Sequence, residues 1–169
     1  MNRAAFVVLA AALAACGRSP APTAQPTPEA IGAEIATFSQ ILVPLSTQTI
    51  SNLKIAAELK GGLQNVTTGD FTPDYQFGSV TADGKPAAVL VAFSDPWLAP
   101  TEALTMPMSL PQFLRAYEAS PKASLAVLIA PRGEIIITRE HLPRVRQVVA
   151  VSGRPDADLP FVLIRGHRR

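Results

Sequence analysis

The chain has 169 residues and a formal net charge of +2, and 48% of its residues are hydrophobic. Its single cysteine excludes an intramolecular disulfide. The charge is unevenly spread, because residues 132–169 carry eight arginines against four acidic residues, whereas residues 16–131 carry six basic and nine acidic residues. Such an asymmetry can mark an anionic partner.

Residues 1–15 have the form of a secretory leader. Arg3 gives it a short positive start, and an apolar run follows over residues 4–12. That run is too short to cross a bilayer as a helix. We therefore expect residues 1–15 to be a signal peptide.

The leader closes on Leu13-Ala14-Ala15-Cys16. This stretch resembles the lipobox of bacterial lipoproteins, in which a Leu stands two residues before a small residue and a Cys follows. The resemblance implies that Cys16 carries a diacylglyceryl group on its sulfur, that everything before it is removed, and that the new amine often gains a third chain such as palmitate. A lone acyl chain binds a membrane reversibly, at ~0.8 kcal/mol per buried methylene, so two or three chains make the attachment lasting.

Gly17, and not Asp, follows the cysteine. By analogy with well-studied envelopes, this favours the outer membrane over the inner one, with the domain facing the periplasm. Residues 17–28 contain four prolines and no apolar periodicity, which is typical of a tether reaching up to ~40 Å at ~3.1 Å per residue. The lipidated cysteine and tether thus occupy residues 16–28, and residues 29–169 have a usual size for one domain.

The first elements of this domain alternate between helical and extended patterns. Apolar residues at helical spacing predict a helix over residues 29–42. Residues 50–60 alternate between apolar and polar positions, which favours a half-buried strand and fits a short helix almost as well. Gly61-Gly62 suits either interpretation, as a hairpin turn or as a helix stop. Residues 67–76 are polar and indicate a loop.

The clearest hairpin joins residues 77–82 to residues 87–93. Asp83-Gly84 lies between them and tolerates the positive backbone angles of a tight turn. Pro86 cannot donate to a strand ladder and belongs at a strand start. Residues 87–93 contain no polar side chain, which predicts a strand buried on both faces.

A short apolar stretch, residues 103–106, precedes the strongest helix, which begins at Ser109. Ser109 and Gln112 have the spacing of a capping box, and Pro111 falls in the first turn. Pro121 ends the helix. Its apolar stripe comprises Leu110, Phe113, Leu114 and Tyr117.

Two further strands and a final helix follow. Residues 125–130 and 134–138 are joined by Pro131-Arg132-Gly133, where Pro and Gly suit a type I turn. The final helix starts near Pro143 and runs to about Val149. We expect its core side to comprise Leu142, Val145, Val148 and Val149, and its water side Arg139, Arg144 and Arg146.

The strand residues expected to meet the Ser109 helix are Val89, Val91, Leu128 and Ile136. The sequence thus predicts an α+β fold, a single two-layer domain with a mixed or antiparallel sheet packed by about three helices.

Several short motifs carry a family resemblance, namely Thr81-Ala82-Asp83-Gly84, Ala92-Phe93-Ser94-Asp95-Pro96, the Ser109 helix, and Val127-Leu128-Ile129-Ala130-Pro131-Arg132-Gly133. In this order they resemble the SseB N-terminal-domain family over about residues 77–149. Ala130 stands where that family often has Asn, and its usual members carry no lipid signal. The resemblance implies an α+β domain over residues 29–169 without a settled activity, and it brings no catalytic residues.

The residues themselves supply no catalytic or cofactor-binding motif. The chain has no Gly-x-Ser-x-Gly elbow, His-Glu-x-x-His helix, P-loop or Gly-x-Gly-x-x-Gly turn, and we predict neither a cofactor nor a metal. His141 at a helix start favours a solvated role, and His167 lies in a tail expected to fray. Asp70 and Asp74 suit a cation or substrate site, but a turn-rich loop more often uses Asp for local backbone bonds.

Two surfaces are candidates for a partner. Arg139, Arg144 and Arg146, with Arg132 on the neighbouring turn, form a basic surface for an anionic envelope component or protein, and the competing interpretation is a solvated helix face. Trp97, the only tryptophan, suits either a stacking platform or a cover for the core edge.

These observations favour a non-catalytic binding or assembly module, attached to the membrane by its lipid, with no nucleic acid partner. The alternative is an envelope hydrolase with an unrecognised carboxylate-based site, for which the chain offers only scattered Asp and Glu. A purely structural lipoprotein usually shows heptads or repeats, and this chain has neither.

Overall fold

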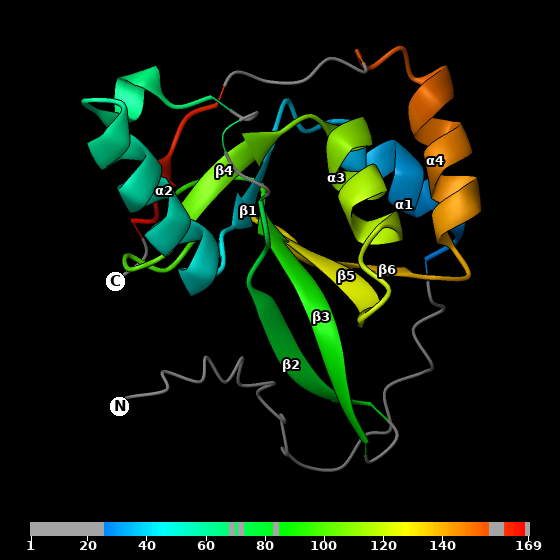
Figure 1. Cartoon of the computed structure of the whole chain (residues 1–169). Coiled ribbons are helices and arrows are strands. Elements are labelled where there is room, and N and C mark those ends of the chain that lie inside the picture. Colours follow the sequence, from blue (N-terminus) through cyan, green and yellow to red (C-terminus); the bar gives the residue numbers. More distant parts are fainter. Residues whose placement is uncertain (1–25, 68–69, 71–72, 83–84, 156–160, 168–169) are drawn as a thin grey trace.

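The computed structural model describes residues 26–67, 70, 73–82, 85–155 and 161–167 (Figure 1). The predicted leader, Cys16 and most of the tether lie outside the described residues. The helices are α1 (Pro28–Ile35), α2 (Thr47–Leu59), α3 (Leu110–Glu118) and α4 (Leu142–Val151), with a 3-10 turn η1 (Leu63–Asn65). The strands are β1 (Ile41–Pro44), β2 (Phe77–Ala82), β3 (Lys85–Phe93), β4 (Leu104–Met108), β5 (Ala123–Ala130), β6 (Gly133–Thr138) and β7 (Ile164–Arg165).

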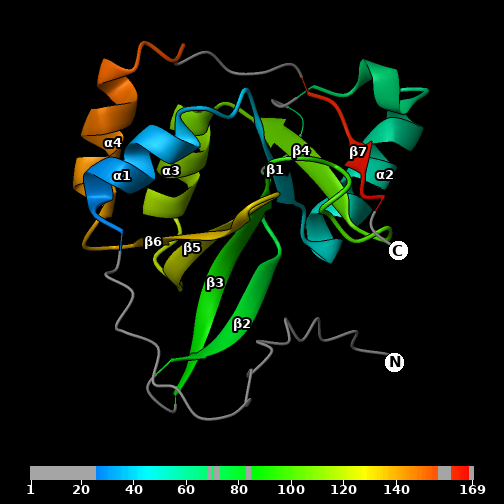
Figure 2. The same cartoon turned by 180° about the vertical axis from the view of Figure 1, so that it is seen from behind.

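All of these strands belong to one open sheet in the order β6-β5-β3-β1-β4-β7, with β2 paired to β3. Strands β3 and β5 run parallel, and α3 lies in the connection between them, whereas the other pairs are antiparallel. The sheet is therefore mixed, and the predicted single α+β domain is confirmed. Figures 1 and 2 show α1, α3 and α4 grouped at one end of the molecule and α2 at the other.

The two faces of the sheet differ in how they are covered. Leu90 and Ala92 of β3 belong to the main core, which includes buried apolar side chains from all four helices in the described chain. Because side chains alternate along a strand, Phe93 points to the other face, where it packs with Leu42 and Ala99 in a small second cluster. The rest of that second face carries no helix in the described chain, and we call it the open face.

The prediction of a helix over residues 29–42 is wrong for the C-terminal part of that range. Helix α1 begins at Pro28, with Thr27 as its N-cap, and stops at Ile35. Residues 41–44 instead form β1, and all four are buried. A run of consecutive apolar residues suits a strand covered on both sides, so burial in the sheet outweighs the helical spacing of Ile41 and Leu42.

The preferred prediction of a strand over residues 50–60 is also wrong, and the alternative prediction of a helix is correct. Helix α2 starts after Ser46, whose hydroxyl accepts a hydrogen bond from the Thr49 amide at 3.1 Å. The apolar alternation does not reflect burial, because Ile55 and Leu59 are 56% and 83% exposed. Gly61, with φ +73°, follows the helix as a stop rather than as a hairpin turn.

The predicted hairpin is confirmed, with β2 and β3 antiparallel from Phe77 opposite Leu90 to Ala82 opposite Lys85. The turn residues Asp83 and Gly84 lie outside the described residues. The expectation that β3 is buried on both faces holds only for part of its length. Its first two residues are exposed because the hairpin extends beyond the helices (Figure 1), and Val91 is half-buried because it faces the side of the sheet that no helix covers.

Helix α3 follows its sequence signals closely. Ser109 and Gln112 form the full capping box, and the four residues of the predicted stripe are buried. Helix α4 is confirmed as well, with Leu142, Val145 and Val149 buried, although Val148 is only half-buried.

Strands β5 and β6 form as expected, but the facing of Ile136 was predicted wrongly. Ile136 is 47% exposed and lies opposite Val127 on the open face, whereas its neighbours Ile135 and Ile137 point into the main core. Val89 is buried and Val91 half-buried, and both also face the open side, since they alternate with Leu90 and Ala92. Of the four strand residues expected beneath α3, only Leu128 belongs to the main core.

Candidate functional site

The four arginines of the predicted basic surface occupy different environments. Arg132 is exposed on the turn between β5 and β6, Arg139 follows β6, and Arg144 and Arg146 lie on α4. The six residues of β6 separate Arg132 from Arg139 by roughly 20 Å at about 3.3 Å per residue. The structure therefore does not bring Arg132 together with the other three.

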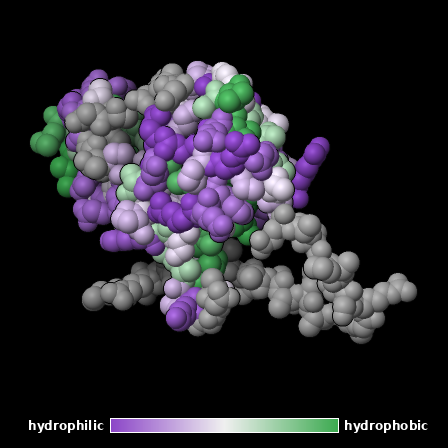
Figure 3. All heavy atoms as spheres, turned by 90° about the vertical axis from the view of Figure 1, so that its right-hand side faces the viewer, coloured by the Kyte–Doolittle hydropathy of each residue, from purple (hydrophilic) through white to green (hydrophobic). Residues whose placement is uncertain are grey.

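Arg144 and Arg146 are exposed, as expected, and each is paired with a carboxylate of a neighbouring helix. Arg144 Nε lies 2.6 Å from Glu29 Oε1 of α1, and Arg146 Nη1 lies 2.6 Å from Glu118 Oε2 of α3. The hydrogen bond from Arg144 lowers the pKa of Glu29 below its ordinary value. Figure 3 shows the side of the molecule that carries α4, where hydrophilic residues predominate. This face is thus polar, and the charges of both α4 arginines are balanced within the domain.

Arg139 is half-buried and bound to backbone carbonyls, whereas the sequence predicts that it faces water. Its Nε donates to the Ala123 carbonyl at 3.0 Å and its Nη1 to the Glu118 carbonyl at 3.2 Å, while Nη2 donates to the Ser120 carbonyl. Its guanidinium also lies over the ring of Tyr117. The carbonyl groups belong to the end of α3 and the start of β5, so Arg139 fastens the connection between those two elements.

Trp97 lies on the loop between β3 and β4 and is 69% exposed. Its backbone amide donates to Asp95 Oδ1 at 2.8 Å, which fixes the turn that presents the ring. The neighbouring residues Leu98 and Ala99, and not Trp97, pack on Leu42 and Phe93. Trp97 therefore does not cover the core edge.

The exposed Trp97 ring contacts the imidazole of His167, with the two centroids 4.7 Å apart and the planes tilted by 49°. His167 is not frayed, because its amide donates to the Pro96 carbonyl at 2.9 Å. Gly166 makes this approach possible, since a Cβ there would overlap the carbonyl oxygens of Ala99 and Pro100. The sequence shows both rings but no pattern that would place them together.

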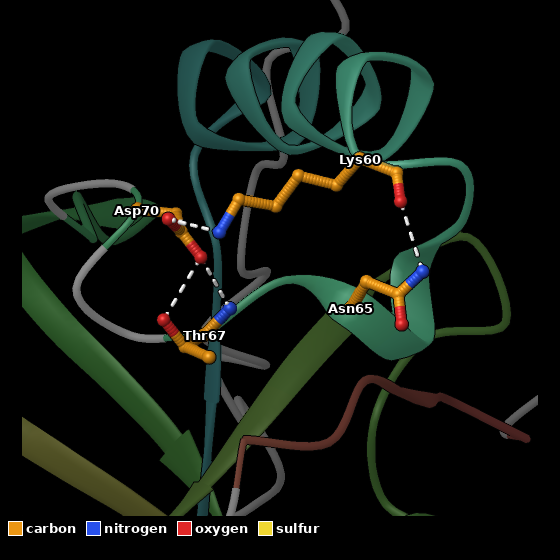
Figure 4. A network of polar contacts seen from close by, with 4 residues as sticks. All are labelled: Lys60, Asn65, Thr67 and Asp70. Carbon is orange, nitrogen blue, oxygen red and sulfur yellow. Dashed lines mark hydrogen bonds and ion pairs between the residues drawn. The ribbon is translucent and has the colours of Figure 1, made fainter.

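Asp70 and Asp74 form local bonds, as the preferred interpretation predicted. Asp70 Oδ1 lies 2.5 Å from Lys60 Nζ, and its Oδ2 accepts from both the amide and the hydroxyl of Thr67 (Figure 4). The hydrogen bonds from Lys60 and Thr67 lower the pKa of Asp70 to about 2. The Asp74 carboxylate accepts from the Tyr75 amide at 3.0 Å, and the Asp74 backbone carbonyl accepts from the Thr49 hydroxyl at 3.0 Å. Both residues therefore tie the loop after η1 to α2.

Two other side chains are of types that could take part in catalysis or binding. Ser94 Oγ and His141 Nδ1 are buried and have no hydrogen-bond partner in the described part of the chain. Within residues 26–67, 70, 73–82, 85–155 and 161–167, no cluster of three or more His, Cys, Asp or Glu side chains is placed to hold a metal ion.

The open face carries a shallow groove between the hairpin and β6. Its floor is apolar and Glu134 lies at its border; the lining residues are Gly78, Ser79, Val80, Val89, Val91, Val127, Ile129 and Glu134. Val91 and Ile129 also pack against the small cluster below the Trp97 loop. The groove therefore borders this small cluster. The sequence does not reveal it, because the pattern places Val89 and Val91 beneath α3.

None of the described helices is long and apolar enough to span a membrane. No family model matches the chain, and neither a curated protein nor a solved structure is similar to it at a significant level.

Proposed function

We propose that this chain is a lipid-anchored protein of the bacterial cell envelope whose α+β domain is a non-catalytic binding or assembly module facing the periplasm. The observation that carries the proposal is Leu13-Ala14-Ala15-Cys16 at the end of an apolar leader, followed by a proline-rich segment. Lasting attachment needs more than one acyl chain, and lipidation of this cysteine supplies them. We also propose the relationship with the SseB N-terminal-domain family, on the four motifs that resemble it.

Metabolic labelling with a radioactive fatty acid tests the anchor. The wild-type chain should take up label and fractionate with membranes, the outer membrane in preference to the inner one. The Cys16→Ser chain should take up no label and either leave the membrane or keep its leader. An unlabelled wild-type chain would refute the lipid anchor.

The binding role is supported by the exposed aromatic surface that Trp97 and His167 form together. The backbone amides of both residues are held by hydrogen bonds, to Asp95 Oδ1 and to the Pro96 carbonyl. Aromatic side chains contribute large contact area at interfaces. Cross-linking in intact cells, followed by capture from solubilised envelope, should give adducts with wild type that Trp97→Ala loses. Leu59→Ala is the matched control, because Leu59 is 83% exposed and lies on α2. Equal adducts from both variants would exclude Trp97 from the contact surface.

The exposed arginines of the predicted basic surface are tested in the same experiment through the salt dependence of partner binding. Exposed charges are screened beyond about 8 Å at physiological ionic strength, so a partner held by Arg144 and Arg146 on α4, or by Arg132 on its separate turn, should dissociate as salt rises. Arg139 is kept unchanged in this comparison because it fastens α3 to β5. Identical adducts from the wild type and the triple Gln variant, at low and moderate salt, would mean that these arginines do not bind the partner.

A further inference from the structure

Strand β6 ends the sheet, and in the described chain no other strand pairs with its outer edge. An unpaired edge presents a row of free backbone groups to any strand that fits it, and natural proteins usually blunt such edges with charge, proline or short length. The opposite terminal strand, β7, is short, with two residues. Strand β6 has six residues, and its centre, Ile135-Ile136-Ile137, contains neither a charge nor a proline.

The side chains of β6 are also unusual for a solvated edge. Ile135 and Ile137 complete the main core, so the strand is anchored in place. Ile136 is 47% exposed on the open face, beside Val127 and close to the apolar groove. A strand added to β6 would cover Ile136 and extend the open face. Strand β2 also has a free edge, but it contains Gly78 and Ser79, and no exposed large apolar residue of the described chain lies on it.

We infer that β6 pairs with β6 of a second copy of this chain, antiparallel and about a two-fold axis at Ile136, so that one sheet runs through both copies. A two-fold contact uses the same surface on both molecules, so its residues must complement themselves. With Ile136 opposite its own counterpart, Glu134 of one copy faces Thr138 of the other. Side chains directly opposite each other in an antiparallel pair share a face, so both isoleucines lie on the open face.

The charges at the two ends of β6 fit this register. Arg132 lies in the turn just before β6 and Glu140 in the turn just after it, so the register brings Arg132 of each copy to the same end of the paired strands as Glu140 of the other. Both side chains are exposed, and neither forms an ion pair within the residues that the structure describes. A shift of the axis to Ile135 would place Arg132 opposite Thr138 and leave Glu140 unmatched. Charge complementarity therefore selects a second copy of this chain, in one register, over an unrelated strand.

Cysteine cross-linking of the full-length chain in its own membrane tests the pairing. Paired Cα atoms in an antiparallel ladder lie about 4.5–5.5 Å apart, within the range of about 4.4–6.8 Å that a disulfide spans. After treatment with copper phenanthroline, Ile136→Cys should give a covalent dimer as its main product on a non-reducing gel. Val151→Cys is the matched control, since Val151 is 89% exposed at the end of α4 and should give only background. Equal yields from these two variants would overturn the inference.

Two further measurements fix the register and the role of the charges. In cells that hold two tagged chains of different mass, Glu134→Cys should cross-link to Thr138→Cys and not to itself. In the Ile136→Cys background, Arg132→Glu should reduce the dimer, and adding Glu140→Arg should restore it. A dimer that is insensitive to Arg132→Glu, or a Glu134→Cys chain that cross-links to itself as well as to Thr138→Cys, would refute this register.

This inference does not depend on the lipid anchor, and its failure is distinguishable from failure of the anchor. The wild-type chain, whose only cysteine is Cys16, is treated in parallel. A Cys16 sulfur that carries a diacylglyceryl group has no free thiol, so a wild-type dimer would refute lipidation without bearing on β6. The β6 variants are then repeated in the Cys16→Ser background, where the same cross-linking pattern is expected.

Discussion

The guanidinium carbon of Arg139 lies 4.2 Å from the centroid of the Tyr117 ring. The Tyr117 hydroxyl in turn donates to the Ser124 carbonyl at 3.0 Å, and burial raises the pKa of this hydroxyl. Arg139 and Tyr117 therefore hold the same segment, the connection from α3 into β5, by polar contacts from two sides. The basic side chain that sequence periodicity assigned to the solvent is part of the framework of the domain.

Arg139→Gln should lower the free energy of unfolding by about 1–3 kcal/mol, because it removes charge-assisted hydrogen bonds to backbone carbonyls and a cation–π contact. Arg144→Gln is the matched control, since its ion pair with Glu29 is exposed to solvent and its loss should change stability less. Urea denaturation followed by circular dichroism measures both. Equal losses in the two variants would show that Arg139 contributes no more than a surface ion pair.

The contact between Lys60 and Asp70 should make stability depend on acid pH. The pKa of Asp70 is about 2 in the folded chain, below its ordinary value of 3.8, so the unfolded chain binds a proton first as the pH falls. The stabilisation is therefore present above about pH 4 and is lost as the pH falls towards 2. The melting temperature of wild type should exceed that of Asp70→Asn at pH 6 and converge with it near pH 2. A constant gap between the two would contradict this linkage.

Leu114→Ala should cost ~2–5 kcal/mol, because Leu114 is only 1% exposed at the centre of the main core. Val151→Ala, at a side chain that is 89% exposed, should change stability by less than about 0.5 kcal/mol. Denaturant midpoints of the two variants against wild type give the comparison. A loss below about 1 kcal/mol for Leu114→Ala would mean that α3 does not pack as described.

Gly166→Ala should separate His167 from Trp97. The added Cβ meets backbone carbonyl oxygens, which cannot rotate away as a side chain can. Trp97 is the only tryptophan, so its fluorescence reports this contact directly. Gly166→Ala and His167→Ala should shift the emission in the same way, and a wild-type spectrum from Gly166→Ala would show that the tail tolerates a side chain there.

Sequence signals predicted best those elements whose local chemistry and burial agree. The capping box at Ser109 and the stripe through Phe113 and Leu114 specify α3 twice over, and the Asp83-Gly84 pair specifies the hairpin. Helix α2 was predicted only as the second choice, because its exposed Ile55 and Leu59 mimic the alternation of a strand. The N-cap at Ser46, three residues before Thr49, was the local signal that distinguishes the helix.

The candidate surfaces could be predicted only in part, because they depend on contacts between distant segments. Helical periodicity places Arg139 on the solvent side. Its hydrogen-bond partners, the backbone carbonyls of Ala123 and Glu118, are 16 and 21 residues away in the sequence, where a local pattern cannot reveal them. Trp97 meets His167 only because β7 pairs with β4. Ile136 was placed in the core because three consecutive isoleucines do not reveal which of them faces the helices. Only the pairing with β5 decides that facing.

The packing of α1 on α4 has a mechanical consequence. Gly32 allows the two helices to lie close together, since a Cβ there would be 2.7 Å from Val148 Cβ, and Glu29 and Ala36 bind Arg144 and Arg154 at the two ends of the contact. Helix α1 belongs to no strand ladder. A pulling force applied on the N-terminal side of Thr27 is therefore resisted first by these side-chain contacts, which break in succession. The detached residues 28–40 would span up to roughly 40 Å when extended, at about 3.3 Å per residue, before any hydrogen bond of the sheet is loaded.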